Sequence, residues 1–337
     1  MKEGKKMSKI GVIGAGSWGT ALATVLAGKG NQVRIFDVDE QHLHRMESSR
    51  EKTDYLPGVK LDENISFAYT TEEAVKDADA VLFSAPAQHF RSAAEAAKPY
   101  ITGEMLLINV AKGIERGTHK RLSQIAEEFF DMNKYVVLSG PSHAEEVGRR
   151  MPTTVAVASR QLSSAEAIQD LFMTDRFRVY TSDDVIGLEL GGALKNIIAL
   201  GAGISDGMGF GDNAKAALMT RGLAEIMRLG EKLGAQRETF AGLAGTGDLI
   251  VTCTSMHSRN RRCGFLIGEG MAPEEAVKEV GMVVEGMYTA EAAYELAKEV
   301  GVEMPITDAI YKVTRGELKA SEAIELLMGR DKKHEQA

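Results

Sequence analysis

Three glycines near the start of this 337-residue chain have the spacing of a phosphate-binding turn. Gly14, Gly16 and Gly19 form a Gly-x-Gly-x-x-Gly pattern that follows an apolar run and opens a helical pattern. In this setting the first glycine makes a tight turn, the second lets the backbone approach a pyrophosphate, and the third lets the helix pack on the strand. The N–H groups at the helix start add partial positive charge. The pattern predicts dinucleotide binding, with a turn required only for packing as the alternative.

Asp37 lies 18 residues after Gly19, at the end of the next apolar run. A carboxylate at this place accepts hydrogen bonds from the hydroxyls of an adenosine ribose, and its charge repels a 2′-phosphate. Arg34 lies three residues earlier, so on an alternating strand it faces the opposite side and is poorly placed to neutralise that charge. The local sequence therefore favours NADH over NADPH. The alternative is that Asp37 caps the following helix.

Two loops that follow later predicted strands carry polar groups. Because the carboxyl ends of parallel strands face the ligand crevice, Lys112 is well placed to hold an anionic substrate. The backbone around Gly140 and the hydroxyl of Ser142 are expected to line the same crevice. His143 has a pKa suited to proton donation, although a single loop histidine is more often structural or solvated.

Residues 191–200 predict an unusual helix, because nearly all of them are small or apolar. Lys195 is the exception. A buried lysine is costly unless it is paired or its pKa is lowered, and a lowered pKa is what a proton-transferring lysine needs. Gly191 and Gly192 leave one helix turn bare, so that another backbone or a cofactor can approach. The alternative is that Lys195 extends to the surface.

Two later segments carry charged groups that could contact a small anionic or hydroxylated substrate. Asp248, in a glycine turn, could pair with Lys195, bind a substrate hydroxyl, or bond to its own backbone. Residues 258–262 hold three arginines in a chain of net charge −8. Because arginine binds phosphate with two parallel hydrogen bonds, this segment predicts a phosphate site, with a solvated helix start as the alternative.

The elements that must position these residues change character near the middle of the chain. Short apolar runs in the first half predict buried parallel strands at residues 9–13, 32–36, 80–85, 105–110, 135–139 and 153–158. Helical patterns lie between them at residues 20–28, 72–77, 90–97 and 118–130. From about residue 184 only helices are predicted, at residues 185–204, 214–233, 259–268, 273–280, 289–300 and 305–315.

This alternation predicts an α/β fold, in which an N-terminal Rossmann-type doubly wound parallel sheet is followed by an all-α C-terminal domain. We place a dinucleotide-binding domain at residues 1–190 and a helical substrate domain at residues 191–337. A site built from both would lie between them.

Composition excludes several other classes of protein. The net charge of −8 disfavours a nucleic-acid-binding surface, and two cysteines are too few for a disulfide framework or a zinc site. The seven scattered histidines predict no metal site. Residues 1–6 are charged and precede no apolar signal segment, and no uncharged run approaches the roughly 18 residues that span a bilayer. These features predict a cytoplasmic protein without a membrane span.

Taken together, the motifs resemble those of bacterial NAD(P)-dependent glycerol-3-phosphate dehydrogenases. Matching segments cover nearly the whole chain, at residues 14–20, 55–58, 111–113, 140–147, 191–196, 201–213, 245–248, 258–262 and 284–286. The resemblance implies reversible hydride transfer between NAD(H) or NADP(H) and carbon 2 of dihydroxyacetone phosphate, which yields sn-glycerol 3-phosphate for glycerophospholipid synthesis. A homodimer is compatible with it.

The resemblance also implies roles for individual residues. Lys195 would be the catalytic proton donor and acceptor. The substrate would be lined by Lys112, Gly140, Ser142, Asp248, Ser258, Arg259 and Asn260. Besides the glycine turn and Asp37, the cofactor would contact Ser17, Trp18, Lys112, Ala144, Arg259, Val283 and Glu285. Two positions depart from the family pattern: Asp37 stands where many members have a basic or small residue, and His143 replaces a phenylalanine common in bacterial members.

Two other functions remain open from the residues alone. A β-hydroxyacid dehydrogenase of the same architecture would also use a lysine, but the arginines of residues 258–262 favour phosphate over carboxylate. A non-catalytic dinucleotide sensor would have no need for a buried Lys195.

Overall fold

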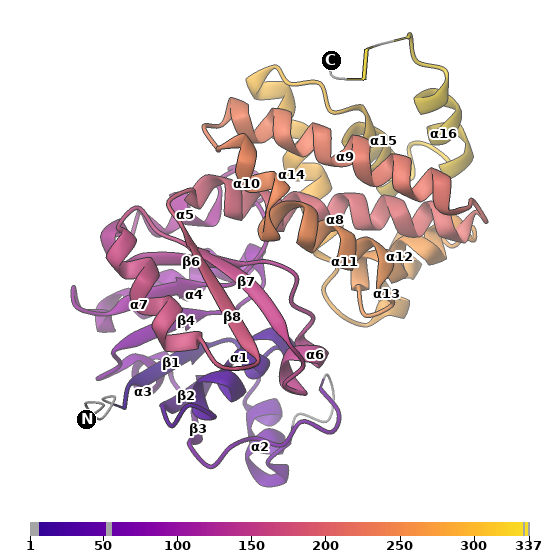
Figure 1. Ribbon diagram of the computed structural model, residues 1–337. Helices are drawn as coiled ribbons and strands as arrows, with labels where there is room; N and C mark the ends of the chain where they lie inside the picture. The colour runs from indigo at the N-terminus through magenta and orange to yellow at the C-terminus, as the bar shows by residue number, and fades with distance from the viewer. Residues whose placement is uncertain (1–6, 52–55, 333, 336–337) are drawn as a thin grey trace.

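The computed structural model describes residues 7–51, 56–332 and 334–335, and its elements form two regions (Figure 1). The sheet region contains β1 to β8 and the helices between them, at the lower left of the figure. The helical region contains α8 to α16, at the upper right. Residues 1–6 and Tyr55, which entered the sequence predictions, lie outside the described residues. The expected fold class is confirmed, while the proposed division after residue 190 stays a prediction.

Eight strands form one sheet in the order β3-β2-β1-β4-β5-β6-β7-β8. Their bounds are β1 Lys9–Ile13, β2 Gln32–Phe36, β3 Ile65–Ala68, β4 Ala80–Phe83, β5 Leu106–Asn109, β6 Tyr135–Ser139, β7 Thr153–Ala158 and β8 Phe177–Ser182. The first six strands are parallel, but β7 pairs antiparallel with β6 and parallel with β8. The expectation of a wholly parallel sheet is therefore wrong at this edge.

The predicted strands all exist, but β3 and β8 were not predicted. Both lie at edges of the sheet and alternate between buried and exposed residues more than the central strands do. By contrast, β4 and β6 are buried along their whole length. Alternate side chains of β4 enter different cores, with Leu82 on one face and Val81 and Phe83 on the other. Helices therefore cover both faces, which explains the continuous apolar runs.

Helices α1 to α7 connect these strands. They are α1 Ser17–Ala27, α2 Glu40–Ser49, α3 Thr71–Val75, α4 Phe90–Ala97, α5 Leu122–Ala126, α6 Ala144–Gly148 and α7 Leu162–Phe172. The prediction of a helix over residues 118–130 is wrong at both ends, because α5 ends at Ala126 and residues 127–130 form a turn. At its start, residues 114–121 form a loop closed by the isolated bridge between Ile114 and Arg121.

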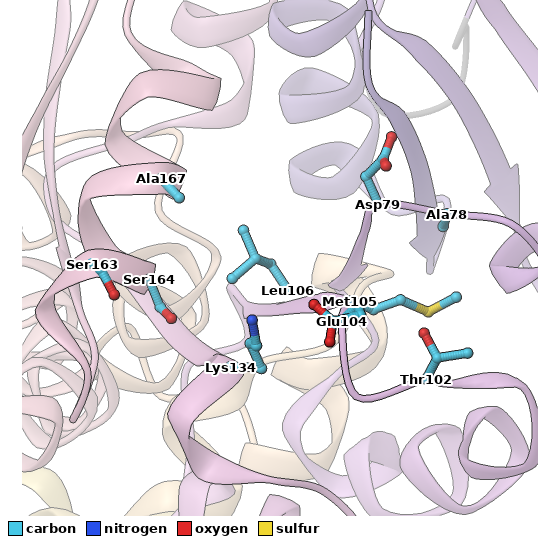
Figure 2. Close-up of a pocket in the computed structure, with 10 residues that line it drawn as sticks. All are labelled: Ala78, Asp79, Thr102, Glu104, Met105, Leu106, Lys134, Ser163, Ser164 and Ala167. Carbon is cyan, nitrogen blue, oxygen red and sulfur yellow. The ribbon is translucent and has the colours of Figure 1, made fainter. Parts of the chain in front are cut away.

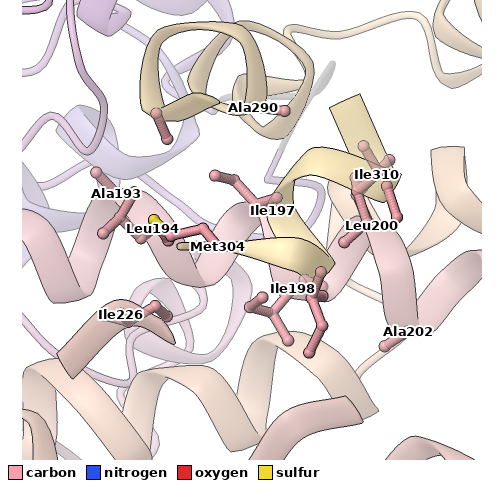
Figure 3. Packing of buried hydrophobic residues seen from close by; sticks show 14 of the residues in the cluster. Ala193, Leu194, Ile197, Ile198, Leu200, Ala202, Ile226, Ala290, Met304 and Ile310 are labelled. Atoms are coloured by element: carbon pink, nitrogen blue, oxygen red, sulfur yellow. The ribbon is translucent and has the colours of Figure 1, made fainter. Parts of the chain in front are cut away.

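The helical region is built around one central helix, α8 Val185–Gly207, most of whose residues are buried. The others are α9 Asp212–Lys232, α10 Arg237–Ala241, α11 Asp248–Thr254, α12 Arg259–Gly268, α13 Pro273–Val280, α14 Glu285–Val300, α15 Pro305–Thr314 and α16 Ala320–Met328. Figure 3 shows side chains of α8 packed among those of neighbouring helices, including Leu194, Ile197, Ile226, Ala290 and Ile310.

Among the described residues, α8 is the one helix long and apolar enough to cross a bilayer, but 94% of its most apolar window is buried inside the protein. Its neighbours explain its composition. A Cβ at Gly191 would come within 2.5 Å of the Ala244 carbonyl oxygen, and one at Gly192 within 2.6 Å of Ser139 Oγ. The bare turn of α8 is thus filled by protein groups from the sheet region and from residues 243–247.

Candidate active site

Two lysines meet one buried carboxylate where the carboxyl ends of β5 and β6 face α8. Lys195 Nζ donates to Asp248 Oδ1 at 2.6 Å, and Lys112 Nζ donates to Asp248 Oδ2 at 2.7 Å. Lys112 also donates to the Gly140 carbonyl at 3.1 Å. Lys195 is 7% exposed and Asp248 1% exposed. The alternatives in which Lys195 extends into solvent, or Asp248 only bonds to its own backbone, are therefore wrong.

The charges of this cluster adjust one another's ionisation. Burial lowers the pKa of Lys195 to about 8, helped by the Lys112 charge and opposed by Asp248. Burial also disfavours ionisation of Asp248, but the two lysines outweigh it and hold its pKa below the usual value. A buried lysine whose pKa lies near neutrality populates both the ammonium, which donates a proton, and the amine, which accepts one, as a general acid–base group must.

Thr252 completes the cluster, although it was not among the residues predicted from the sequence. Its hydroxyl receives a hydrogen bond from Lys195 Nζ at 2.6 Å and lies 2.6 Å from the Asp248 carbonyl oxygen. Asp248 and Thr252 are four residues apart at the start of α11, so both face the same side of that helix. The i, i+4 spacing of two polar residues in an otherwise apolar segment is the signal that could have found it.

The glycine turn has the geometry that the sequence predicted. Gly14 has a φ of 110°, and a Cβ there would come within 2.8 Å of the backbone at Ser84 and Ala85. Asp37 lies beside the turn, where Oδ2 accepts from the Ala15 amide at 2.6 Å and Oδ1 from the Asp39 amide at 3.1 Å. Asp39, and not Asp37, caps α2.

Several features around this turn fit a bound dinucleotide. A Cβ at Gly16 would meet no atom within 4 Å, and no side chain caps α1, so this helix start has space for a phosphate. Trp18 Nε1 and Glu285 Oε2 are buried without a hydrogen-bond partner. The remaining residues assigned to the cofactor by resemblance begin α1, begin α6 and precede α14: Ser17, Ala144 and Val283. The donor set therefore suits a nicotinamide dinucleotide.

Glu285 connects the two regions at the start of α14. Its Oε1 accepts from the Ala87 amide at 3.1 Å, and its Oε2 lies 3.5 Å from where a Cβ of Gly113 would be. Burial raises the pKa of Glu285, against the Ala87 amide and the nearby Arg259 charge. The Arg259 charge is therefore near Glu285, whose Oε2 lies beside Gly113, the residue after Lys112.

Ser142 and His143, which were also predicted to lie at the site, make different kinds of contact. Ser142 donates to the Gly140 carbonyl at 2.8 Å, beside the Lys112 contact. His143 lies with Nε2 3.4 Å from the Val251 carbonyl oxygen, and burial together with the Lys195 charge lowers its pKa. A proton-donating role for His143 stays a prediction.

Residues 258–262 have different surroundings: some pack within the helical region, while Arg259 is exposed. Ser258 caps α12 through the Arg261 amide, and Asn260 joins the Asn196 side chain at 2.9 Å to the Gly286 amide at 2.8 Å. Arg261 pairs with Asp206 at 2.7 Å and so supports the helix packing. Arg259 is exposed at the first turn of α12. The substrate roles of these residues stay predictions.

Two hollows of the described chain lie away from this cluster. One, of about 310 Å³, is lined by residues such as Asp79, Glu104 and Lys134 near the amino ends of the strands (Figure 2). The other, of about 1160 Å³, lies among α8, α9, α15 and α16. Neither is lined by a predicted site residue, so neither changes the position of the candidate site.

The sheet with its glycine turn, joined to helices that present a buried lysine at the same edge, defines the class of nicotinamide-dinucleotide-dependent dehydrogenases. Residues 9–165 match the family described as NAD-dependent glycerol-3-phosphate dehydrogenase N-terminus, and residues 184–325 match the corresponding C-terminus. The chain belongs to this glycerol-3-phosphate dehydrogenase family.

Individual relatives agree over the full length. A glycerol-3-phosphate dehydrogenase [NAD(P)+] of Clostridium perfringens is 52% identical over 98% of this chain and 100% of its own. One of Bacillus cereus is 54% identical over 98% of each chain. The crystal structure of glycerol-3-phosphate dehydrogenase from Coxiella burnetii has a TM-score of 0.92 at 36% identity, covering 96% of this chain and 99% of its own.

Proposed function

We propose that this protein reduces dihydroxyacetone phosphate reversibly to sn-glycerol 3-phosphate with NADH or NADPH. The observation that carries the chemistry is the buried contact of Lys195 with Asp248, at the edge of the sheet that also holds the glycine turn. Family membership supports the substrate and the cofactor. The position of Lys112 across Asp248 supports binding of an anion in the same cleft.

In this proposal the bound nicotinamide supplies or accepts the hydride at carbon 2. Lys195 Nζ donates a proton to the oxygen on that carbon as it gains negative charge, and takes the proton back in the oxidation. Asp248 remains ionised and holds the ammonium in place, since both lysines lower its pKa. The substrate phosphate stays unchanged, so its contacts with cations serve to orient carbon 2.

The direct test mixes the protein with NADH or NADPH and dihydroxyacetone phosphate and follows loss of the reduced nicotinamide. A β-hydroxyacid dehydrogenase would oxidise its cofactor with a 2- or 3-keto acid and not with dihydroxyacetone phosphate. A dinucleotide sensor would bind NADH, detectable through the single tryptophan, Trp18, without turnover. Either of those results would replace the proposed function.

We predict that Arg259→Ala raises the KM for dihydroxyacetone phosphate by roughly 10- to 150-fold, with a smaller change in kcat. The loss of one charge-assisted contact to phosphate costs about 1.5–3 kcal/mol. Inorganic phosphate should compete with substrate in the wild type and much less in the variant. Arg237→Ala is the matched control, because Arg237 pairs with Glu231 on the exposed surface. An unchanged KM in Arg259→Ala would remove Arg259 from phosphate binding.

We predict that the wild type prefers NADH and that Asp37→Asn raises the kcat/KM ratio of NADPH to NADH by about 10-fold. A carboxylate 4 Å from a phosphate repels it by about 4 kcal/mol at an effective dielectric of 20, and the partial exposure of Asp37 reduces this. Asparagine keeps an oxygen for the Ala15 amide of the turn and loses only the longer contact with the Asp39 amide. Asp37→Ser, which shortens the side chain, should show the same direction. A wild-type preference for NADPH above tenfold would contradict the assignment of Asp37 to the ribose.

We further propose a cytoplasmic location and a role in supplying glycerophospholipid synthesis. Both cysteines are free and buried, and burial raises the pKa of Cys253 to about 12 and that of Cys263 to about 11, so both are unreactive thiols suited to a reducing compartment. Homodimer formation stays a prediction.

A further inference from the structure

The loop over residues 113–121, here called the strap, follows Lys112 directly and crosses from the sheet region to α14. It turns back on itself, since the Glu115 amide donates to the Lys120 carbonyl at 3.0 Å and the His119 amide to the Glu115 carbonyl at 3.0 Å. His119 has a φ of 55°, a left-handed conformation that a non-glycine residue keeps only where its surroundings hold it. The strap is therefore an ordered loop with a defined backbone conformation.

On the sheet side the strap is held by α4 and the short turn before it. Arg91 donates to the two carboxylate oxygens of Glu115 at 2.8 and 2.9 Å, a bidentate pair. Gln88 donates to the Ile114 carbonyl at 2.8 Å and accepts from the Arg116 amide at 3.0 Å. These contacts fix the first half of the strap relative to the sheet.

On the other side the strap is held by one face of α14. Arg116 pairs with Glu291 at 2.8 Å. The ring nitrogens of His119 lie 2.7 Å from Glu295 and 2.8 Å from Glu299. His119 therefore has two acidic partners on α14, one at each ring nitrogen.

The contacts along α14 form a continuous row. Glu291, Glu295 and Glu299 are spaced four residues apart, so they lie on the same side of the helix. Ile114 is fully buried in the hydrophobic core of the helical region, although it belongs to the chain of the sheet region. With Glu285 bound to the Ala87 amide, α14 is attached to the sheet region over roughly 21 Å of its length.

We propose that Arg116 and His119 are positioning residues for the proposed reaction, and that they hold Lys112 against Asp248 by tying the strap to α14. This inference rests on the proposed function for its kinetic consequences but not for its structural ones. Lys112 lies three residues after the end of β5, and the next residue, Gly113, is the first of the strap. A Cβ at Gly113 would come within 2.4 Å of Ala87 Cβ, so the backbone has little room to shift there.

With the strap fixed, only the side-chain rotations of Lys112 remain to be ordered, and Asp248 and the Gly140 carbonyl order them. Loss of the Arg116 and His119 contacts would free α14 from the strap. The helical region that carries Asp248 could then move away from Lys112, whose backbone stays held on the sheet side. The cation that meets the substrate would then be less well placed, while the glycine turn would be unaffected.

The test compares Arg116→Ala, His119→Ala and the double variant with Arg160→Ala. Arg160 pairs with Glu127 on the exposed surface of the same region and serves as the matched control. We expect the KM for dihydroxyacetone phosphate to rise about 3- to 10-fold in the double variant, the size expected from loss of two partly exposed ion-pair contacts. Binding of NADH, followed by Trp18 fluorescence, should not change. A variant that combines Arg116→Glu with Glu291→Arg keeps this ion pair with its charges exchanged, so its KM should lie within about 2-fold of the wild-type value.

A second readout depends on Lys195. Its ammonium is faced by Asp248, Lys112, Thr252, Cys253 and His143. Since the Lys112 charge helps to lower the pKa of Lys195, displacement of Lys112 should move the pH at which the reduction rate declines to higher values. A strap that only stabilises the fold would lower the thermal midpoint and leave this pH unchanged.

A third readout needs no turnover. Acylation of Lys112 by an amine-reactive ester, measured by peptide mass spectrometry, should be about 3- to 10-fold faster in the double variant and unchanged in Arg160→Ala. Equal acylation rates in wild type and double variant would overturn the inference, whatever the protein does with dihydroxyacetone phosphate. If the wild type does not turn over that substrate, the proposed function fails while the acylation result still decides the role of the strap.

Discussion

Lys195→Met is expected to lower kcat for dihydroxyacetone phosphate reduction by roughly 10²- to 10⁴-fold, the usual contribution of a general acid–base group. Methionine fills a similar volume in the apolar surroundings of α8, and Asp248 keeps its ion pair with Lys112. The fold and NADH binding should therefore be preserved, as checked by circular dichroism and Trp18 fluorescence. Lys76→Met, at an exposed position, is the matched control.

The pH dependence follows from the same residue. Because the pKa of Lys195 is about 8, the reduction should slow as the pH rises through about 8, where the proton donor is lost. Oxidation of sn-glycerol 3-phosphate should accelerate over the same range, since it needs the neutral amine. The residual activity of Lys195→Met should show neither of these rate changes near pH 8. Near-normal kcat in that variant would exclude Lys195 from proton transfer.

Asp248→Asn is expected to have the second large effect, on stability and activity together. The substitution leaves two lysines facing a neutral amide whose NH₂ group cannot accept from either of them. Breaking a buried ion pair in this way costs about 3–5 kcal/mol of the free energy of unfolding. The expected fall in kcat/KM is at least about 10²-fold, since Lys195 loses the charged partner that holds its ammonium in position. Urea denaturation and steady-state kinetics measure the two effects.

The direction in which the stability of Asp248→Asn changes with pH distinguishes loss of the ion pair from general misfolding. The pKa of Lys195 is already lower in the folded protein than its ordinary 10.5, so the unfolded chain binds more protons between the two values. Stability from this group therefore increases as the pH rises through that window. Without Asp248 the folded pKa falls further, and the variant should recover stability as the pH rises toward 10.5. Asp79→Asn, at an exposed carboxylate, should show no such recovery.

Much of the architecture could be predicted because local patterns are enough to form it. Six strands, the long helix α8 and the glycine turn each depend on residues close together in sequence. The edge strands β3 and β8 were missed because their mixed exposure weakens the apolar signal. The first turn of the predicted helix at residues 118–130 failed for a different reason: Arg116 and His119 have partners on α14, and those contacts outweigh local helix propensity.

The sequence by itself determined which chemical groups this protein has and on which kind of element each lies: a glycine turn for a dinucleotide, a lysine in an apolar helix and a carboxylate in a glycine-rich segment. It left open whether Asp248 pairs with Lys195. Only the tertiary structure decided that one carboxylate serves two lysines, 53 and 136 residues away. The physical reason is that a charge is buried only with a partner, and the packing of α8 against the sheet edge determines which partners come within hydrogen-bonding distance.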